Sequence, residues 1–167
     1  VVDSVICRVD PITNEVTIFW TLLPGVPPEC CTKIVILKDG VPLTDAQVAD
    51  ALRAGVAHPE KVRLLKVDSV PMPDHPMLRA AGAATQLMPP LAAGFTLRYG
   101  IIIRADRWSD RWLVVHELVH TAQFERLGGF GPFLRQYLSE CLTIGYPAAP
   151  MEQEAIIAAN RLCGAED

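Results

Sequence analysis

The chain has 167 residues, of which 50% are hydrophobic and 20% charged; these values predict a single globular domain over residues 1–167 and exclude a disordered chain. Its net charge of -4 comes without any cluster of lysine and arginine, so no nucleic-acid partner is expected. Every apolar stretch is too short to span a bilayer and the N-terminus lacks the pattern of a signal peptide, so no membrane association is expected.

The first forty residues contain three short segments rich in β-branched and aromatic residues, at positions 5–9, 15–21 and 33–37. The third segment ends at Asp39-Gly40, a dipeptide typical of tight turns. The sequence therefore predicts a small antiparallel sheet in this region.

Short helices and further strands are expected in the middle of the chain. Thr44, with Gln47 three residues later, forms a capping-box pattern that predicts a short helix. Residues 61–70 alternate weakly, as in a strand, and the alanine-rich segment 76–87 favours a second short helix. Residues 95–104 predict one long strand, because their apolar side chains first alternate and then become continuous.

The last part of the chain is predicted to be helical. Ser109 is a candidate N-cap for a helix that ends at the pair Gly128-Gly129, since glycine commonly terminates helices. Pro132 and Pro150 suit the first turns of two further helices.

Together these segments predict an α+β fold. A small antiparallel or mixed sheet with short helices is expected in residues 1–105. This sheet is expected to pack on a set of helices formed by residues 106–167.

The helix predicted after Ser109 contains the sequence His116-Glu117-Leu118-Val119-His120. Residues four apart on an α-helix project from the same face, so both imidazoles can reach one zinc ion. Glu117 would lie beside the metal, where its carboxylate can act as a general base toward a water molecule. The alternative is that both histidines are structural, but their burial without partners would cost several kcal/mol, which favours a metal site.

A tetrahedral catalytic zinc site needs a third protein ligand, with the fourth position left for water. A third histidine on the same helix is excluded, because Arg126 stands at the required position. A later carboxylate is the natural alternative, and the candidates are Glu125, Glu140, Glu152 and Glu154. Glu125 is the least suitable, because it lies five positions after His120 on the same helix and so points about 140° away.

The spacing of His116-Glu117-x-x-His120 and Glu152-x-x-Ala155 resembles the gluzincins, the thermolysin-like clan of zinc peptidases. In that clan a glutamate on a later helix is the third ligand, and Glu152 matches it by position. Ile156 stands where the clan has an aspartate that orients the first histidine. Residues 112–155 are also similar to bacterial HExxH proteins assigned as peptidases, in Gln123, Tyr137 and the segment Pro150-Met151-Glu152-Gln153-Glu154-Ala155.

The resemblance implies a single zincin-like domain that binds Zn2+ and cleaves a peptide bond in a peptide or protein substrate. The implied metal ligands are His116, His120 and Glu152, and the implied catalytic base is Glu117. Two histidines and a glutamate could also hold other divalent ions, but zinc is the metal that the pattern favours.

Two further features of such enzymes have candidates in this chain. A strand upstream of the active helix pairs with the extended substrate, and residues 100–103 are the candidate, with an ordinary interior strand as the alternative. Candidates for stabilising the oxyanion are Tyr137, Tyr146 and Arg135, with helix packing as the alternative role of each.

Five cysteines are irregularly spaced, and no pair has the Cys-x-x-Cys spacing. This pattern argues against a cysteine zinc site and favours reduced thiols, so a cytoplasmic protein is expected. The alternative function is a zinc-binding domain without hydrolytic activity that acts as an interaction module. Glu117 argues against this alternative, since a structural zinc site does not need that carboxylate.

Overall fold

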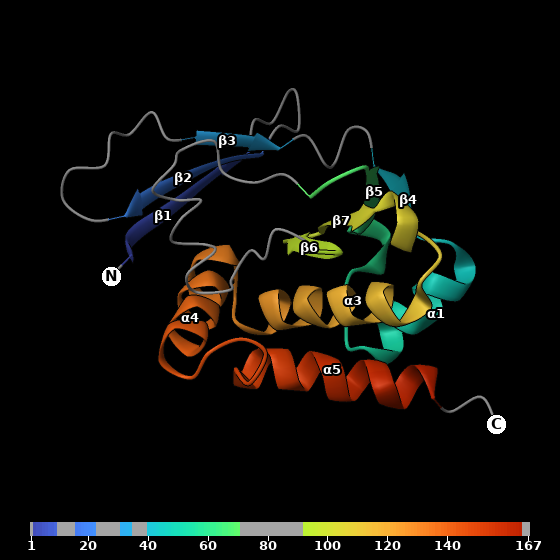
Figure 1. Cartoon of the computed structure of the whole chain (residues 1–167). Helices are drawn as coiled ribbons and strands as arrows, with labels where there is room; N and C mark the ends of the chain where they lie inside the picture. The colour runs from blue at the N-terminus through green and yellow to red at the C-terminus, as the bar shows by residue number, and fades with distance from the viewer. Residues whose placement is uncertain (1, 10–15, 23–30, 35–39, 71–91, 165–167) are drawn as a thin grey trace.

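The computed structural model describes five stretches of the chain: residues 2–9, 16–22, 31–34, 40–70 and 92–164 (Figure 1). The expected helix over residues 76–87 lies outside these stretches. None of the described helices has the length and apolar character needed to cross a membrane.

The described strands form two sheets. The first is antiparallel, with the order β1 (Val2–Val9), β2 (Val16–Leu22) and β3 (Cys31–Ile34). The second sheet is mixed, with the order β4-β5-β7-β6, and it contains β4 (Val41–Pro42), β5 (Arg63–Val67), β6 (Gly94–Leu97) and β7 (Gly100–Arg104). In this sheet β5 and β7 run parallel, whereas the two outer pairs are antiparallel.

The helices lie mainly on one side of the mixed sheet (Figure 1). They are α1 (Asp45–Arg53), α3 (Arg111–Arg126), α4 (Phe130–Thr143) and α5 (Pro150–Cys163), with 3-10 turns at Pro59–Lys61 and Ala105–Arg107. Helix α3 lies between the mixed sheet and α5, and it also contacts α1 and α4. The fold is therefore α+β, with α3 as its central helix.

The helix ends follow local sequence signals. The capping box before α1 is confirmed, because the Thr44 and Gln47 side chains each accept a hydrogen bond from the other's backbone N–H, at 3.3 and 2.9 Å. The N-cap of α3 is Asp110, not Ser109: its carboxylate accepts a hydrogen bond from Leu113 N at 3.1 Å. A carboxylate at this position also interacts favourably with the helix dipole.

The prediction of one strand over residues 95–104 is wrong. The segment is a hairpin of β6 and β7, in which Arg98 turns the chain with a φ of 58°. The long apolar run belongs to β7 alone, whose isoleucines at positions 101–103 are each 0% exposed.

Of the two roles left open for residues 100–103, an edge strand or an ordinary interior strand, the structure shows the interior strand. Strand β7 lies between β5 and β6, so the backbone groups of β7 are paired on both sides. This interior position explains its continuous apolar sequence, since both faces of the strand are covered. Among the described strands, β6 is the edge of the mixed sheet on this side.

Helix α3 is buried on nearly all sides, from Leu113 to Phe124. One face contributes Leu113, Leu118 and Ala122 to an apolar cluster with the mixed sheet and α1, and Phe124 joins a second cluster with α4 and α5. A helix in this position exposes few side chains to water, so each polar group that it carries needs a partner inside the protein.

Candidate metal centre

Two histidines project from the same face of α3, one helical turn apart. The side chains of His116 and His120 are buried, with residue exposures of 7% and 5%. Their Nε2 atoms are 3.2 Å apart, and their rings meet edge to face. The helical spacing that the sequence predicted therefore brings two imidazole nitrogens to one point.

Glu152 reaches this point from the first turn of α5. Its Oε1 lies 3.2 Å from His120 Nε2, and its Oε2 lies 3.4 Å from His116 Nε2. Small residues on the buried face of α5, Ala155 and Ala159, are each 0% exposed and allow the helix to approach α3 closely. Donor atoms of the three side chains all lie within 4.8 Å of one another, so this group could hold a metal ion.

Two buried atoms of this group lack hydrogen bonds. His116 Nδ1 and Glu152 Oε2 have no hydrogen-bond partner among the described residues. Glu152 Oε2 is close enough to His116 for an ion pair, but the geometry is not that of a hydrogen bond. Glu152 is only 1% exposed, so a carboxylate oxygen without a hydrogen bond is costly here. Coordination to a cation is one way to satisfy this oxygen.

Burial and charge oppose each other at Glu152 and His120. Burial alone would raise the pKa of Glu152, but the neighbouring imidazoles and the Tyr137 hydroxyl outweigh it and hold this pKa well below its usual range. Burial alone would lower the pKa of His120, but the charges of Glu152 and Glu117 outweigh it and raise this pKa. Glu152 is therefore an anion at neutral pH, as a metal ligand must be.

Each ligand candidate is held by a different neighbour. The His120 ring has Gln123 Oε1 2.8 Å from its Nδ1. The His116 ring is stacked against Trp112, whose indole N–H donates to Asn160 on α5 at 2.7 Å. The Tyr137 hydroxyl, on α4, donates to Glu152 Oε1 at 2.5 Å.

Glu117 lies on the side of the site that faces the mixed sheet, where it contacts β6. The Thr96 hydroxyl donates to Glu117 Oε2 at 2.5 Å. Gly94 leaves room for the same carboxylate, because a Cβ at this position would lie only 2.6 Å from Glu117 Oε1. One carboxylate oxygen is thus fixed by a hydroxyl group, and the other lies over a glycine.

The four polar residues of the site line one cavity of about 350 Å³. Most of its remaining lining is apolar and comes from β6, α3 and α4, including Phe95, Leu97, Phe133 and Leu134. Such a cavity suits a ligand with an apolar group next to a polar reaction centre.

The other candidate carboxylates have other partners. Glu125 accepts hydrogen bonds from the backbone of residues 57 and 58, at 2.6 and 3.0 Å. Glu140 accepts a hydrogen bond from Met151 N at 2.8 Å, at the start of α5. Glu154 is paired with Arg126. Of the four candidates, only Glu152 lies with the two histidines.

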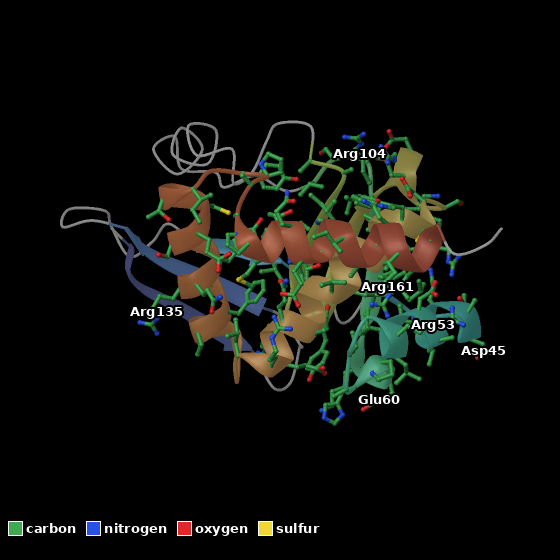
Figure 2. All side chains as sticks on the ribbon, turned by 90° about the horizontal axis from the view of Figure 1, so that it is seen from below. Asp45, Arg53, Glu60, Arg104, Arg135 and Arg161 are labelled. Carbon is green, nitrogen blue, oxygen red and sulfur yellow. The ribbon has the colours of Figure 1, made fainter. Side chains whose placement is uncertain are left out.

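The three oxyanion candidates differ in whether they line the cavity. Tyr137 and Tyr146 line the cavity, and burial is the main cause that raises the pKa of Tyr146 to about 12. Arg135 is exposed and points outward from α4, away from the other helices (Figure 2). Arg135 is therefore not placed to act on a substrate in this cavity.

Several residues around the site were not among the sequence candidates. Gly94 and Thr96 contact Glu117 because β6 packs on α3, whereas Trp112 lies one turn before His116 on α3 itself and stacks on its ring. The alternation in residues 95–104 indicated a strand, but no local pattern relates Thr96 to a carboxylate 21 positions later.

Comparisons of the chain with protein-family models, with curated proteins and with solved structures give no match. The similarity to the gluzincins therefore stays a resemblance in the residues of the motif.

Proposed function

We propose that this protein is a zinc-dependent hydrolase, of the metallopeptidase type. One observation carries the proposal: three buried donor groups meet within 4.8 Å, and the carboxylate of Glu117 lines the same cavity beside them. Three protein ligands with a neighbouring carboxylate are the composition of a catalytic zinc site, whereas structural zinc sites have four protein ligands.

In this proposal His116, His120 and Glu152 would hold the zinc ion, which when bound supplies a Lewis acid for the scissile carbonyl. Glu117 accepts the proton of the attacking water and passes it to the leaving amine. The hydrogen bond from Thr96 to Glu117 Oε2 orients this carboxylate in the cavity.

A peptide is the substrate class that we favour. Strand β6 is the edge of the mixed sheet among the described strands, and its residues 94–97 line the cavity next to Glu117. An extended peptide can add to such an edge through backbone hydrogen bonds. In the proposal β6 therefore takes the role first expected for residues 100–103.

A second candidate function is a metal-binding interaction module without hydrolytic activity. The observation that favours it is Ile156, which lines the cavity where the gluzincins have an aspartate. Without that aspartate, His116 Nδ1 has no partner among the described residues. The two functions differ in what they require of Glu117.

The experiment that separates them combines metal analysis with one substitution. Protein purified without a metal-affinity tag is expected to contain about one zinc per chain, measured by elemental mass spectrometry. Glu117→Gln is expected to keep this zinc and the fold, and to lose hydrolysis of peptides that the wild type cleaves, because the amide cannot accept the proton. Unchanged turnover in this variant would remove the proposed mechanism, and a wild type that binds zinc but cleaves no peptide would favour the interaction module.

The third ligand can be tested with matched substitutions on neighbouring carboxylates. Glu152→Ala is expected to weaken zinc binding in a chelator competition far more than Glu140→Ala or Glu154→Ala. The reason is that only Glu152 has its carboxylate within reach of both histidines. A larger effect of either control substitution would mean that a different residue completes the site.

A further inference from the structure

Gln123 is a buried polar residue that the proposed reaction does not use. It lies on α3 one turn after His120, and its exposure is 0%. A side-chain amide in such a position carries two N–H groups and one carbonyl oxygen, and all of them need partners. The partners therefore determine which way the amide faces.

The contacts of Gln123 Nε2 fix this orientation. Nε2 donates to the backbone carbonyl of Met151 at 2.9 Å and to Glu154 Oε2 at 3.0 Å. Both partners accept hydrogen bonds and cannot donate them. With the amide turned over, the Gln123 carbonyl oxygen would face two acceptors, so the opposite orientation is excluded.

The Glu154 carboxylate is itself held in place. Arg126 donates to both of its oxygens, each at 2.8 Å. This hydrogen-bonded ion pair fixes the position of the carboxylate that faces Gln123. The orientation of the buried amide thus depends on an ion pair at the surface between α3 and α5.

The fixed amide determines where the hydrogen of His120 lies. Gln123 Oε1 can only accept, and it is 2.8 Å from His120 Nδ1, so Nδ1 must carry a hydrogen. Nε2 is then the nitrogen whose lone pair is available to a metal, and Nε2 is the atom that lies 3.2 Å from both His116 and Glu152. No comparable contact acts on His116, whose Nδ1 lacks a hydrogen-bond partner among the described residues.

We propose that Gln123 is a positioning residue, which fixes His120 in the Nδ1–H form and so sets the zinc affinity of the site. The proposal rests on the metal centre of the proposed function but not on hydrolysis. Outer contacts of this kind commonly contribute about 10- to 100-fold to metal affinity.

The test uses the full chain with zinc, one variant at position 123 and a control variant. Gln123→Met removes the acceptor for His120 at nearly constant volume, and we expect about 10- to 100-fold weaker zinc binding in a chelator competition. The matched control is Gln153→Met on α5, since the Gln153 side chain donates to Pro147 O and does not contact the site.

Nitrogen NMR of the zinc-loaded, histidine-labelled wild type gives a readout that a purely structural role would not change. We expect His120 to coordinate through Nε2, with a Nδ1–H resonance protected from exchange, and we expect this protection to be lost in Gln123→Met. Coordination through Nδ1 would overturn the proposal even if no variant folds. Zinc binding in Gln123→Met within threefold of the wild type would overturn it too. A wild type that binds no zinc would overturn the proposed metal centre itself, which is a distinct result.

Discussion

The close approach of Gly94 to Glu117 leads to a prediction whose size follows from the structure. In Gly94→Ala the new Cβ would lie 2.6 Å from Glu117 Oε1, 3.0 Å from Cδ and 3.1 Å from Cγ. Ordinary contacts of a Cβ begin near 3.4 Å, so Oε1 must move by about 0.8 Å. The side chain cannot make this movement freely, because the Thr96 hydroxyl holds Oε2 at 2.5 Å.

A displacement of this size is large for the proposed catalytic base. A misplacement of about 1 Å can cost about 100-fold in rate, which corresponds to about 2.7 kcal/mol of transition-state stabilisation. We therefore expect kcat/KM of Gly94→Ala to fall about 100-fold on quenched fluorescent peptides that the wild type cleaves. Zinc content should stay at one per chain, because Glu117 is not among the grouped metal-binding residues.

Gly131→Ala is the matched control, since a Cβ at Gly131 on α4 meets no atom within 4 Å. Its activity should equal that of the wild type. Thr96→Val tests the other contact with Glu117 and should also reduce activity, whereas Thr96→Ser keeps the hydroxyl and should retain most of it. Wild-type kcat/KM in Gly94→Ala would refute this reasoning, and loss of zinc in the variant would show that the substitution acts on the ligands instead.

Three more predictions concern the metal centre. Tyr137→Phe removes the hydroxyl bound to Glu152, so the metal-free protein should lose about 1.5–3 kcal/mol of unfolding free energy at pH 7 in denaturant titrations. The folded-state pKa of Glu152 is lowered from 4.5, so the ionised carboxylate contributes fully to stability above pH 4.5 and this contribution is lost on acidification below it. The difference in unfolding free energy between Tyr137→Phe and the wild type should shrink over the same range. Zinc affinity should increase by up to about tenfold per pH unit as the pH rises toward the raised pKa of His120, because below this pKa a proton must leave before zinc binds, and it should level off at higher pH. Chelator titrations that show no pH dependence would contradict this. Ile156→Asp should tighten zinc binding by giving His116 Nδ1 an acceptor, and unchanged affinity would mean that the carboxylate does not reach it.

The sequence was a good guide where structure depends on neighbouring residues. The capping box at Thr44 and the glycine stop after α3 are short-range patterns, and the structure contains both. The same is true of His116 and His120, because a helix of fixed pitch places residues four apart on one face. The paired imidazoles could therefore be predicted from the motif alone.

The hairpin was missed because its turn lacks the usual residues. Arg98 has a φ of 58° without being glycine or asparagine, so nothing in the sequence marks the chain reversal before β7. The error also misassigned the edge of the sheet, since it merged β6 with the interior strand. A strand's place in a sheet depends on its pairing partners, and these are remote in sequence.

The choice among the carboxylates illustrates the same limit. Glu152 and Glu154 are two residues apart in the first turn of α5, and helix geometry alone does not say which one faces α3. The answer depends on their partners, because Arg126 pairs with Glu154 while Tyr137 donates to Glu152. Within the sequence, only the resemblance to a known motif favours Glu152 over Glu154.

The energetics of the site connect its chemistry with the fold. Unsatisfied buried polar atoms cost about 1–3 kcal/mol each, and this site has two of them, at His116 Nδ1 and Glu152 Oε2. Structural zinc in zinc-finger peptides contributes about 10–16 kcal/mol at neutral pH, a scale that is larger than this cost. Because α3 supplies both histidines and α5 supplies the glutamate, a metal at this point would join the two helices. Polar groups that weaken the metal-free core would then stabilise the packing of α5 on α3 once the metal is bound.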